Sequence, residues 1–191
     1  MKRNKKIILL CHCILNCNSK VEGCSLYGGA MPEITMALVD SGVGMLQLPC
    51  PELTLYGVKR WGHVKEQFDT PYYRRHCRSI FTPYLDQLQD YIRSGYEISG
   101  LLGINGSPSC GIDKTCTGSW GGEFSEIPDI RNTLESVRMV NSRGVFIEEL
   151  SSMLLGNNID LPFIGIDEAE MAASIEKIYN FLGGQIQNGN T

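Results

Sequence analysis

Cysteines follow three apolar runs of this 191-residue sequence. Cys13 lies shortly after KIILL, Cys50 follows VGMLQL, and Cys110 follows ISGLLGI within the glycine-rich stretch NGSPSCG. Three thiolates that meet in space have few uses: with a fourth ligand they hold zinc, and they also hold iron–sulfur clusters. The spacing includes no CxxC pair, so the sequence does not decide between a zinc site and an iron–sulfur cluster. The competing interpretation is three buried apolar side chains, because free cysteine is often buried.

The other cysteines need separate interpretations. The chain has eight cysteines, which in a secreted protein would suggest disulfides and in a reducing compartment point to metal binding or catalysis. Cys17 is the main competitor of Cys13 for the first ligand position. The remaining four are expected to be structural: Cys11, Cys24, Cys77 and Cys116.

Apolar runs alternate with helical patterns along the chain. Strands are predicted over 6–10, 43–48, 98–104 and 162–166. Helices are predicted within 28–42, over 70–94, from about 130, over 146–155 and over 168–182. This alternation predicts an α/β fold: a mainly parallel sheet with helices on both faces, in a Rossmann-like three-layer arrangement. Without a repeat or linker, we expect a single domain over 1–191, with a loose polar tail from about 185 to 191.

Several local signals refine these elements. The stretch 51–70 is predicted to be irregular. Pro83 is expected to kink or divide the long helix, because proline removes a backbone donor. Asp167 is expected to cap the last helix, which should end at Gly183 and Gly184.

The predicted topology tells where the cysteines should lie. In open α/β sheets, ligands bind outside the carboxyl ends of the strands, near the point where the strand order reverses. If the first three strands are neighbours, Cys13, Cys50 and Cys110 converge at one edge of the sheet. The sequence therefore predicts a metal or cluster site at this edge.

Composition and charge argue against several functions. The formal net charge is −4 and no Lys/Arg block runs through the chain, so we expect no nucleic-acid partner. No apolar stretch approaches the roughly 18 residues that span a membrane. The run IILL is shorter than the roughly 7–15 apolar residues of a signal peptide, so we expect a cytoplasmic protein, monomeric or homodimeric. No G-x-G-x-x-G follows the first strand, which argues against dinucleotide binding.

Three short motifs lie at the predicted strand ends: HCILN at 12–16, CPE at 50–52 and SPSCG at 107–111. HCILN is similar to the SACLLG opening of the thiouracil desulfurase (TudS) family, and the other two match its later signatures in order and position. The resemblance spans roughly 6–150 and is nearest to a TudS-related branch of desulfidases. The family's RYDG-like stretch appears here only as NSKVEG, and LTLYGVKRWGH replaces its segment after CPE. The cluster therefore carries over better than the substrate.

The resemblance implies a 4Fe-4S cluster bound by Cys13, Cys50 and Cys110, whose open iron takes the sulfur of a small thiolated substrate, such as a thionucleobase or thioamide. It implies carbon–sulfur cleavage without net redox change, in which water supplies the replacing oxygen. An aerobic preparation could lack the cluster. Two alternatives belong to other classes: a non-catalytic iron–sulfur or sulfur-carrier protein, and a zinc-stabilised structural domain.

Polar residues beside the cysteines are candidates for acid–base chemistry. Glu52 is the predicted general base, because it lies two residues after Cys50, with a surface or capping role as the alternative. Ser109 is the predicted catalytic proton relay and Ser107 a predicted substrate-binding residue; both could instead be turn-forming hydroxyls. Asp113 is expected to shape the loop.

Histidines and aromatic side chains could also face the site. A lone histidine is more often structural, which applies to His12 and His63. Trp61 and Tyr56 could stack on a heterocycle or simply pack.

Overall fold

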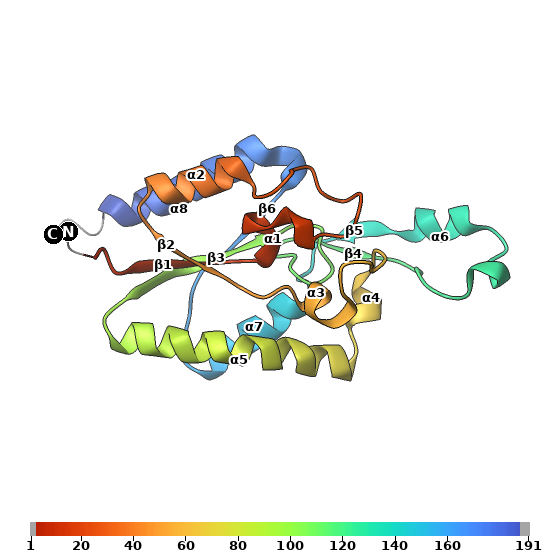
Figure 1. Cartoon of the computed structure of the whole chain (residues 1–191), viewed down its shortest axis with the longest axis horizontal. Helices are drawn as coiled ribbons and strands as arrows, with labels where there is room; N and C mark the ends of the chain where they lie inside the picture. The colour runs from red at the N-terminus through yellow and green to blue at the C-terminus, as the bar shows by residue number, and fades with distance from the viewer. Residues whose placement is uncertain (1–2, 188–191) are drawn as a thin grey trace.

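The computed structural model describes residues 3–187, with the side chains of Phe124 and of 184–187 left aside. Its main sheet has four parallel strands in the order β2-β1-β3-β6 (Figure 1). These strands are β1 (Lys6–Leu10), β2 (Gly44–Gln47), β3 (Glu97–Ile104) and β6 (Phe163–Ile166). The four strands predicted from apolar runs are confirmed within a residue or two at each end.

Helices cover both faces of the sheet. On one face, α2 (Pro32–Asp40) packs beside α8 (Met171–Gln187), and on the other α5 (Pro71–Arg93) packs beside α7 (Val145–Gly156) (Figure 1). The predicted α/β fold, a mainly parallel sheet between two helical layers, is therefore confirmed.

The central strands are continuous apolar runs because both of their faces are buried. Fully buried side chains of β1 and β3 form the middle of the core: Ile8, Leu9, Leu10, Leu101 and Leu102. The chain leaves β1 for β2 on one side and later returns to β3 on the other. The strand order thus reverses between β1 and β3, and their carboxyl ends flank the place where ligands bind in such sheets.

A small arm projects from this end of the sheet (Figure 1). It contains a two-stranded antiparallel sheet of β4 (Thr115–Thr117) and β5 (Arg138–Val140), with η2 (Phe124–Glu126) and α6 (Ile130–Ser136) between them. The helix beginning at Ile130 was predicted. Strands of three residues are too short for their alternation to be recognised, so β4 and β5 were not.

The prediction that 51–70 is irregular is wrong. This stretch contains α3 (Pro51–Tyr56) and α4 (Lys65–Phe68). A proline at the first helical position favours helix initiation, and the Cys50 sulfur accepts the Leu53 N–H at 3.4 Å in place of an oxygen cap. Such short helices depend on their packing, so their sequence signal is weak.

The long helix is not divided at Pro83. It runs as one element, α5, because an apolar face lies buried against the core on both sides of the proline. The buried side chains of that face are Tyr73, Cys77, Phe81, Leu85 and Leu88.

The last helix also continues beyond its predicted end, through Gly183 to Gln187. Residues 185–187 of the predicted loose tail are therefore helical, and 188–191 lie outside the described residues. Asp167 does cap the entry to this segment, because its side chain accepts the Ala169 N–H at 3.2 Å at the start of η3 (Glu168–Glu170). Among the described residues, none of the helices has the length and apolar character needed to span a membrane.

Candidate functional site

The structure brings Cys13, Cys50 and Cys110 to one cavity of about 300 Å³ at the carboxyl edge of the sheet. Cys13 lies in the short helix α1 (His12–Leu15) just after β1. Cys50 precedes α3 after β2, and Cys110 lies in the turn after β3. Residues distant in sequence meet here because parallel strands end at the same edge.

Cys13, not Cys17, is the cysteine of this segment that lines the cavity. Cys17 lies in η1 (Cys17–Ser19), where its sulfur donates to the Cys13 carbonyl at 3.2 Å, and it faces a separate crevice. Cys11 is fully buried, its thiol makes a hydrogen bond with the Cys110 thiol, and it does not line the cavity. Cys77 is also buried in the core.

A hydroxyl within the SPSCG turn, that of Ser107, stabilises the turn. Ser107 Oγ accepts the N–H groups of Ser109 and Cys110 at 3.3 and 3.0 Å, so the predicted turn-forming role of Ser107 is present in addition to its place in the cavity. The hydroxyls of Ser107 and Ser109 lie 3.2 Å apart.

Helix α7 fixes the same turn from behind. Its first N–H groups donate to the turn, from Val145 to the Pro108 carbonyl and from Phe146 to the Ser109 carbonyl, both at 3.0 Å. Gly144 allows this approach, because a Cβ there would lie 2.4 Å from the Ser109 carbonyl carbon. The turn that carries Cys110 is therefore rigidly attached to the core.

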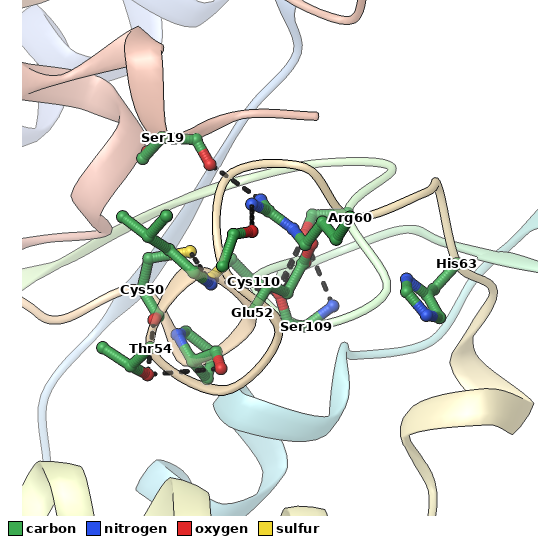
Figure 2. Close-up of polar contacts among 12 residues, drawn as sticks. Ser19, Cys50, Glu52, Thr54, Arg60, His63, Ser109 and Cys110 are labelled. Carbon is green, nitrogen blue, oxygen red and sulfur yellow. Dashed lines mark hydrogen bonds and ion pairs between the residues drawn. The ribbon is translucent and has the colours of Figure 1, made fainter. Parts of the chain in front are cut away.

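Glu52 and Ser109 meet at the cavity wall (Figure 2). The Ser109 hydroxyl donates to Glu52 Oε1 at 2.5 Å, and its oxygen lies 3.7 Å from the Cys110 sulfur. Both residues are buried, so the alternative in which Glu52 is a surface side chain is wrong. This pair can pass a proton between a group in the cavity and the Glu52 carboxylate.

Arg60 holds the other side of Glu52 (Figure 2). Its Nε donates to Glu52 Oε2 at 3.2 Å, and its remaining nitrogens donate to the carbonyls of Ser19 at 2.7 Å and Gly57 at 3.1 Å. A buried carboxylate needs such a partner. Sequence analysis missed Arg60, because one arginine in a loop carries no recognisable pattern.

The surroundings of the three thiols keep them protonated. Burial, reinforced by the neighbouring thiols, raises the pKa of Cys13 well above its usual value and that of Cys50 to about 12. The hydrogen bond with Cys11, together with burial, raises the pKa of Cys110. Positive charge in the cavity would favour their thiolate forms, because metal ligands must be deprotonated.

Other charged and polar groups complete the cavity. Lys20 and Glu168 form an ion pair at 2.5 Å in its lining, and neither was predicted. Cys24 and Cys116 also line it, with Cys24 exposed and Cys116 buried, so their purely structural interpretation is incomplete. His63 lines the cavity too, and burial lowers its pKa.

Some candidates lie elsewhere. Asp113 accepts a hydrogen bond from Asn105 and lies 3.8 Å from the Lys177 ammonium, outside the cavity lining, in keeping with a loop-shaping role. The His12 ring contacts the Leu48 carbonyl at 3.1 Å and lies outside the lining as well. Tyr56 stacks on His63, which belongs to the packing alternative.

Among residues 3–187, no group of three or more His, Cys, Asp or Glu side chains is arranged to hold a single metal ion. The three cysteines line the cavity together with Glu52 and Ser109.

Comparisons with known proteins give one curated relative. The chain is 39% identical over 112 residues to the protein MJ0003 of Methanocaldococcus jannaschii, described as uncharacterized; the match covers 59% of this chain and 71% of that protein. No family model and no solved structure matches the chain. The chain belongs to the same family as MJ0003.

Proposed function

We propose that this protein is a TudS-related desulfidase, which replaces the sulfur of a small thiolated compound by oxygen from water without net redox change. The observation that carries the proposal is the meeting of Cys13, Cys50 and Cys110 in one cavity beside the Glu52–Ser109 pair. Thiol ligands and an acid–base pair are the two components that such a hydrolysis needs.

The three cysteines are the proposed ligands of a 4Fe-4S cluster. When bound, the cluster would supply a Lewis-acidic iron for the sulfur of the substrate. The SPSCG turn holds Cys110, and Cys50 is the N-cap residue of α3, so two of the ligands lie on well-supported backbone.

Glu52 is the proposed general base. The overall reaction converts C=S and water into C=O and hydrogen sulfide, so a proton must leave the attacking water. Ser109 can accept that proton while its own hydroxyl proton moves to Glu52 Oε1, with which it is already hydrogen-bonded. Arg60 balances the carboxylate charge that makes Glu52 an acceptor.

The cavity favours a small substrate. Its volume of about 300 Å³ would have to hold the cluster as well as the substrate, which limits the substrate to a single ring or thioamide, and Ser107 lines it beside Ser109 as a candidate donor to the substrate. The ionised side chains in the lining are paired, Lys20 with Glu168 and Glu52 with Arg60, which fits an uncharged polar molecule.

An anaerobic assay tests the proposal. The iron–sulfur-loaded protein should release hydrosulfide from 2-thiouracil or thioacetamide, and a reaction run in ¹⁸O-labelled water should place the label in the product. Glu52→Gln should lower the rate about 10²- to 10⁴-fold while the iron content stays unchanged.

The Glu52→Gln variant also separates the proposal from its main alternative. A loaded protein that releases no hydrosulfide from either compound, with wild type and variant equally inactive, would contradict the desulfidase and leave a non-catalytic iron–sulfur or sulfur-carrier protein.

A further inference from the structure

A second cavity lies beside the cysteine cavity, and both tryptophans of the chain line it. It has a volume of about 220 Å³. Trp61 comes from the loop between α3 and α4, and Trp120 comes from the loop after β4. Trp120 Nε1 donates to the Gly62 carbonyl at 3.0 Å, which ties the two loops together. We call this space the tryptophan crevice.

The two cavities share a wall. Gly62 and His63 line both of them. The His63 ring stacks against Tyr56 and Phe68, with ring centroids 5.0 and 4.8 Å apart, so packing holds the imidazole in position. A molecule in the crevice would therefore lie next to a molecule in the cysteine cavity.

The lining of the crevice defines what it can bind. Among the described residues that line it there is no Asp, Glu, Lys or Arg side chain, which favours an uncharged ligand. Trp61 is 73% exposed, so much of the residue is accessible to a ligand in addition to its contacts within the chain.

Gln67 adds a directional polar group. Its Oε1 accepts the Val64 N–H at 3.0 Å, which fixes the amide and leaves the two N–H bonds of Nε2 for another acceptor. A Cβ on Gly121, a neighbouring wall residue, would lie 3.7 Å from this Nε2, so the amide nitrogen reaches the crevice lining.

We propose that the tryptophan crevice binds an uncharged, planar heteroaromatic ring, such as the base of a nucleoside. The ring stacks on Trp61 and Trp120, and Gln67 donates to a ring nitrogen or carbonyl. A quaternary ammonium group can also bind between aromatic rings, but it has no acceptor for an amide N–H, and the positive end of the amide dipole opposes a cation. This site is independent of the proposed desulfidase activity.

Intrinsic fluorescence tests the proposal directly, because the two tryptophans of the chain both lie in the crevice. Adenosine and uridine should each be titrated into the full-length protein, and at least one should cause a saturable change. Trp61→Ala should raise its Kd roughly 5- to 150-fold, the range for loss of one base–indole stack, with Trp120 as the remaining reporter. Gln67→Glu keeps the acceptor for Val64 but removes the amide donor, and should also weaken binding.

Two control variants make the result specific. Tyr179→Ala removes an exposed aromatic ring on α8, outside the crevice lining, and should leave Kd unchanged. Cys110 does not line the crevice, so Cys110→Ala should also leave Kd unchanged in a folded variant, whether or not the cysteines hold a cluster.

Four outcomes would overturn the proposal. These are no saturable change with either nucleoside up to its solubility limit, an unchanged Kd in Trp61→Ala, loss of binding in Cys110→Ala, and a response to tetramethylammonium alone. The third would place the nucleoside in the cysteine cavity, and the fourth would make the crevice a cation site. A protein without desulfidase activity would not change the interpretation of these binding experiments.

Discussion

Arg60 and Glu52 form an ion pair in which the side chains are only 3% and 10% exposed. The guanidinium donates to the carboxylate and also to the carbonyls of Ser19 and Gly57, so it links the loop after α3 to Glu52 in α3 and to Ser19 in η1. The other carboxylate oxygen, Oε1, accepts a hydrogen bond from the Ser109 hydroxyl. One arginine thus orients the group that we propose as general base.

Arg60→Met should destabilise the protein by about 3–5 kcal/mol, because it leaves the Glu52 carboxylate buried without a cation. Urea unfolding followed by circular dichroism measures this free energy. Lys114→Met is the matched control, since Lys114 pairs with Asp167 at 3.6 Å near the surface and its removal should cost less than about 1 kcal/mol. The double variant Arg60→Met/Glu52→Leu should lose less stability than the sum of the single changes. Additive losses would contradict the pairing.

Ser109→Ala should cost about 1–3 kcal/mol, because the buried Glu52 then lacks one hydrogen bond. Thermal or urea unfolding provides the measurement. In the anaerobic assay, the same variant should release hydrosulfide more slowly while retaining wild-type iron. Ser25→Ala, an exposed serine outside the cysteine cavity, serves as the control. An active Ser109→Ala variant at the wild-type rate would remove Ser109 from the proton path.

Gly144→Ala should destabilise the protein by about 1–3 kcal/mol, because the new methyl group would press on the backbone of Ser109 and Cys110. Gly183→Ala is the contrasting change: a Cβ at Gly183 meets nothing within 4 Å inside α8, so alanine should stabilise the helix by up to about 1 kcal/mol. Opposite shifts in the urea midpoint are expected. Equal effects would show that α7 does not press on the SPSCG turn.

Cysteine alkylation should be strongly selective. At pH 8, iodoacetamide should modify the exposed Cys24 first, whereas Cys116 should react slowly, because burial raises its pKa to about 11 and leaves roughly one thiol in a thousand ionised. The Cys116 rate should rise about tenfold per pH unit below that pKa, since only the thiolate reacts. Peptide mass spectrometry follows both sites. Equal labelling of the two at pH 8 would contradict the burial of Cys116.

Much of the fold can be predicted from apolar runs in the sequence. The strands β1 and β3 are apolar runs that are mostly buried, whereas the edge strands are less covered: β2 is exposed or half-buried and β6 is half-buried over its first two residues. Once the strand order is correct, the meeting of the three cysteines follows from the parallel arrangement alone.

The rest depends on contacts that a local pattern does not encode. Pro83 continues a helix because packing outweighs its lost hydrogen bond. Arg60 belongs to the site because the loop after α3 folds back onto Glu52. Trp120 reaches the same crevice as Trp61 only through the arm that β4 and β5 build. The buried face of α5 and the tryptophan crevice depend on residues far apart along the chain, and the Arg60–Glu52 pair depends on how the loop after α3 folds.

The central claim is that Cys13, Cys50 and Cys110 hold an iron–sulfur cluster. Its most direct test is purification under nitrogen, with visible absorption, iron and acid-labile sulfide measured beside a Cys110→Ala variant. The account predicts a brown protein with about four irons and four sulfides per chain, lost in the variant. A colourless protein that takes up no cluster after anaerobic reconstitution would contradict it.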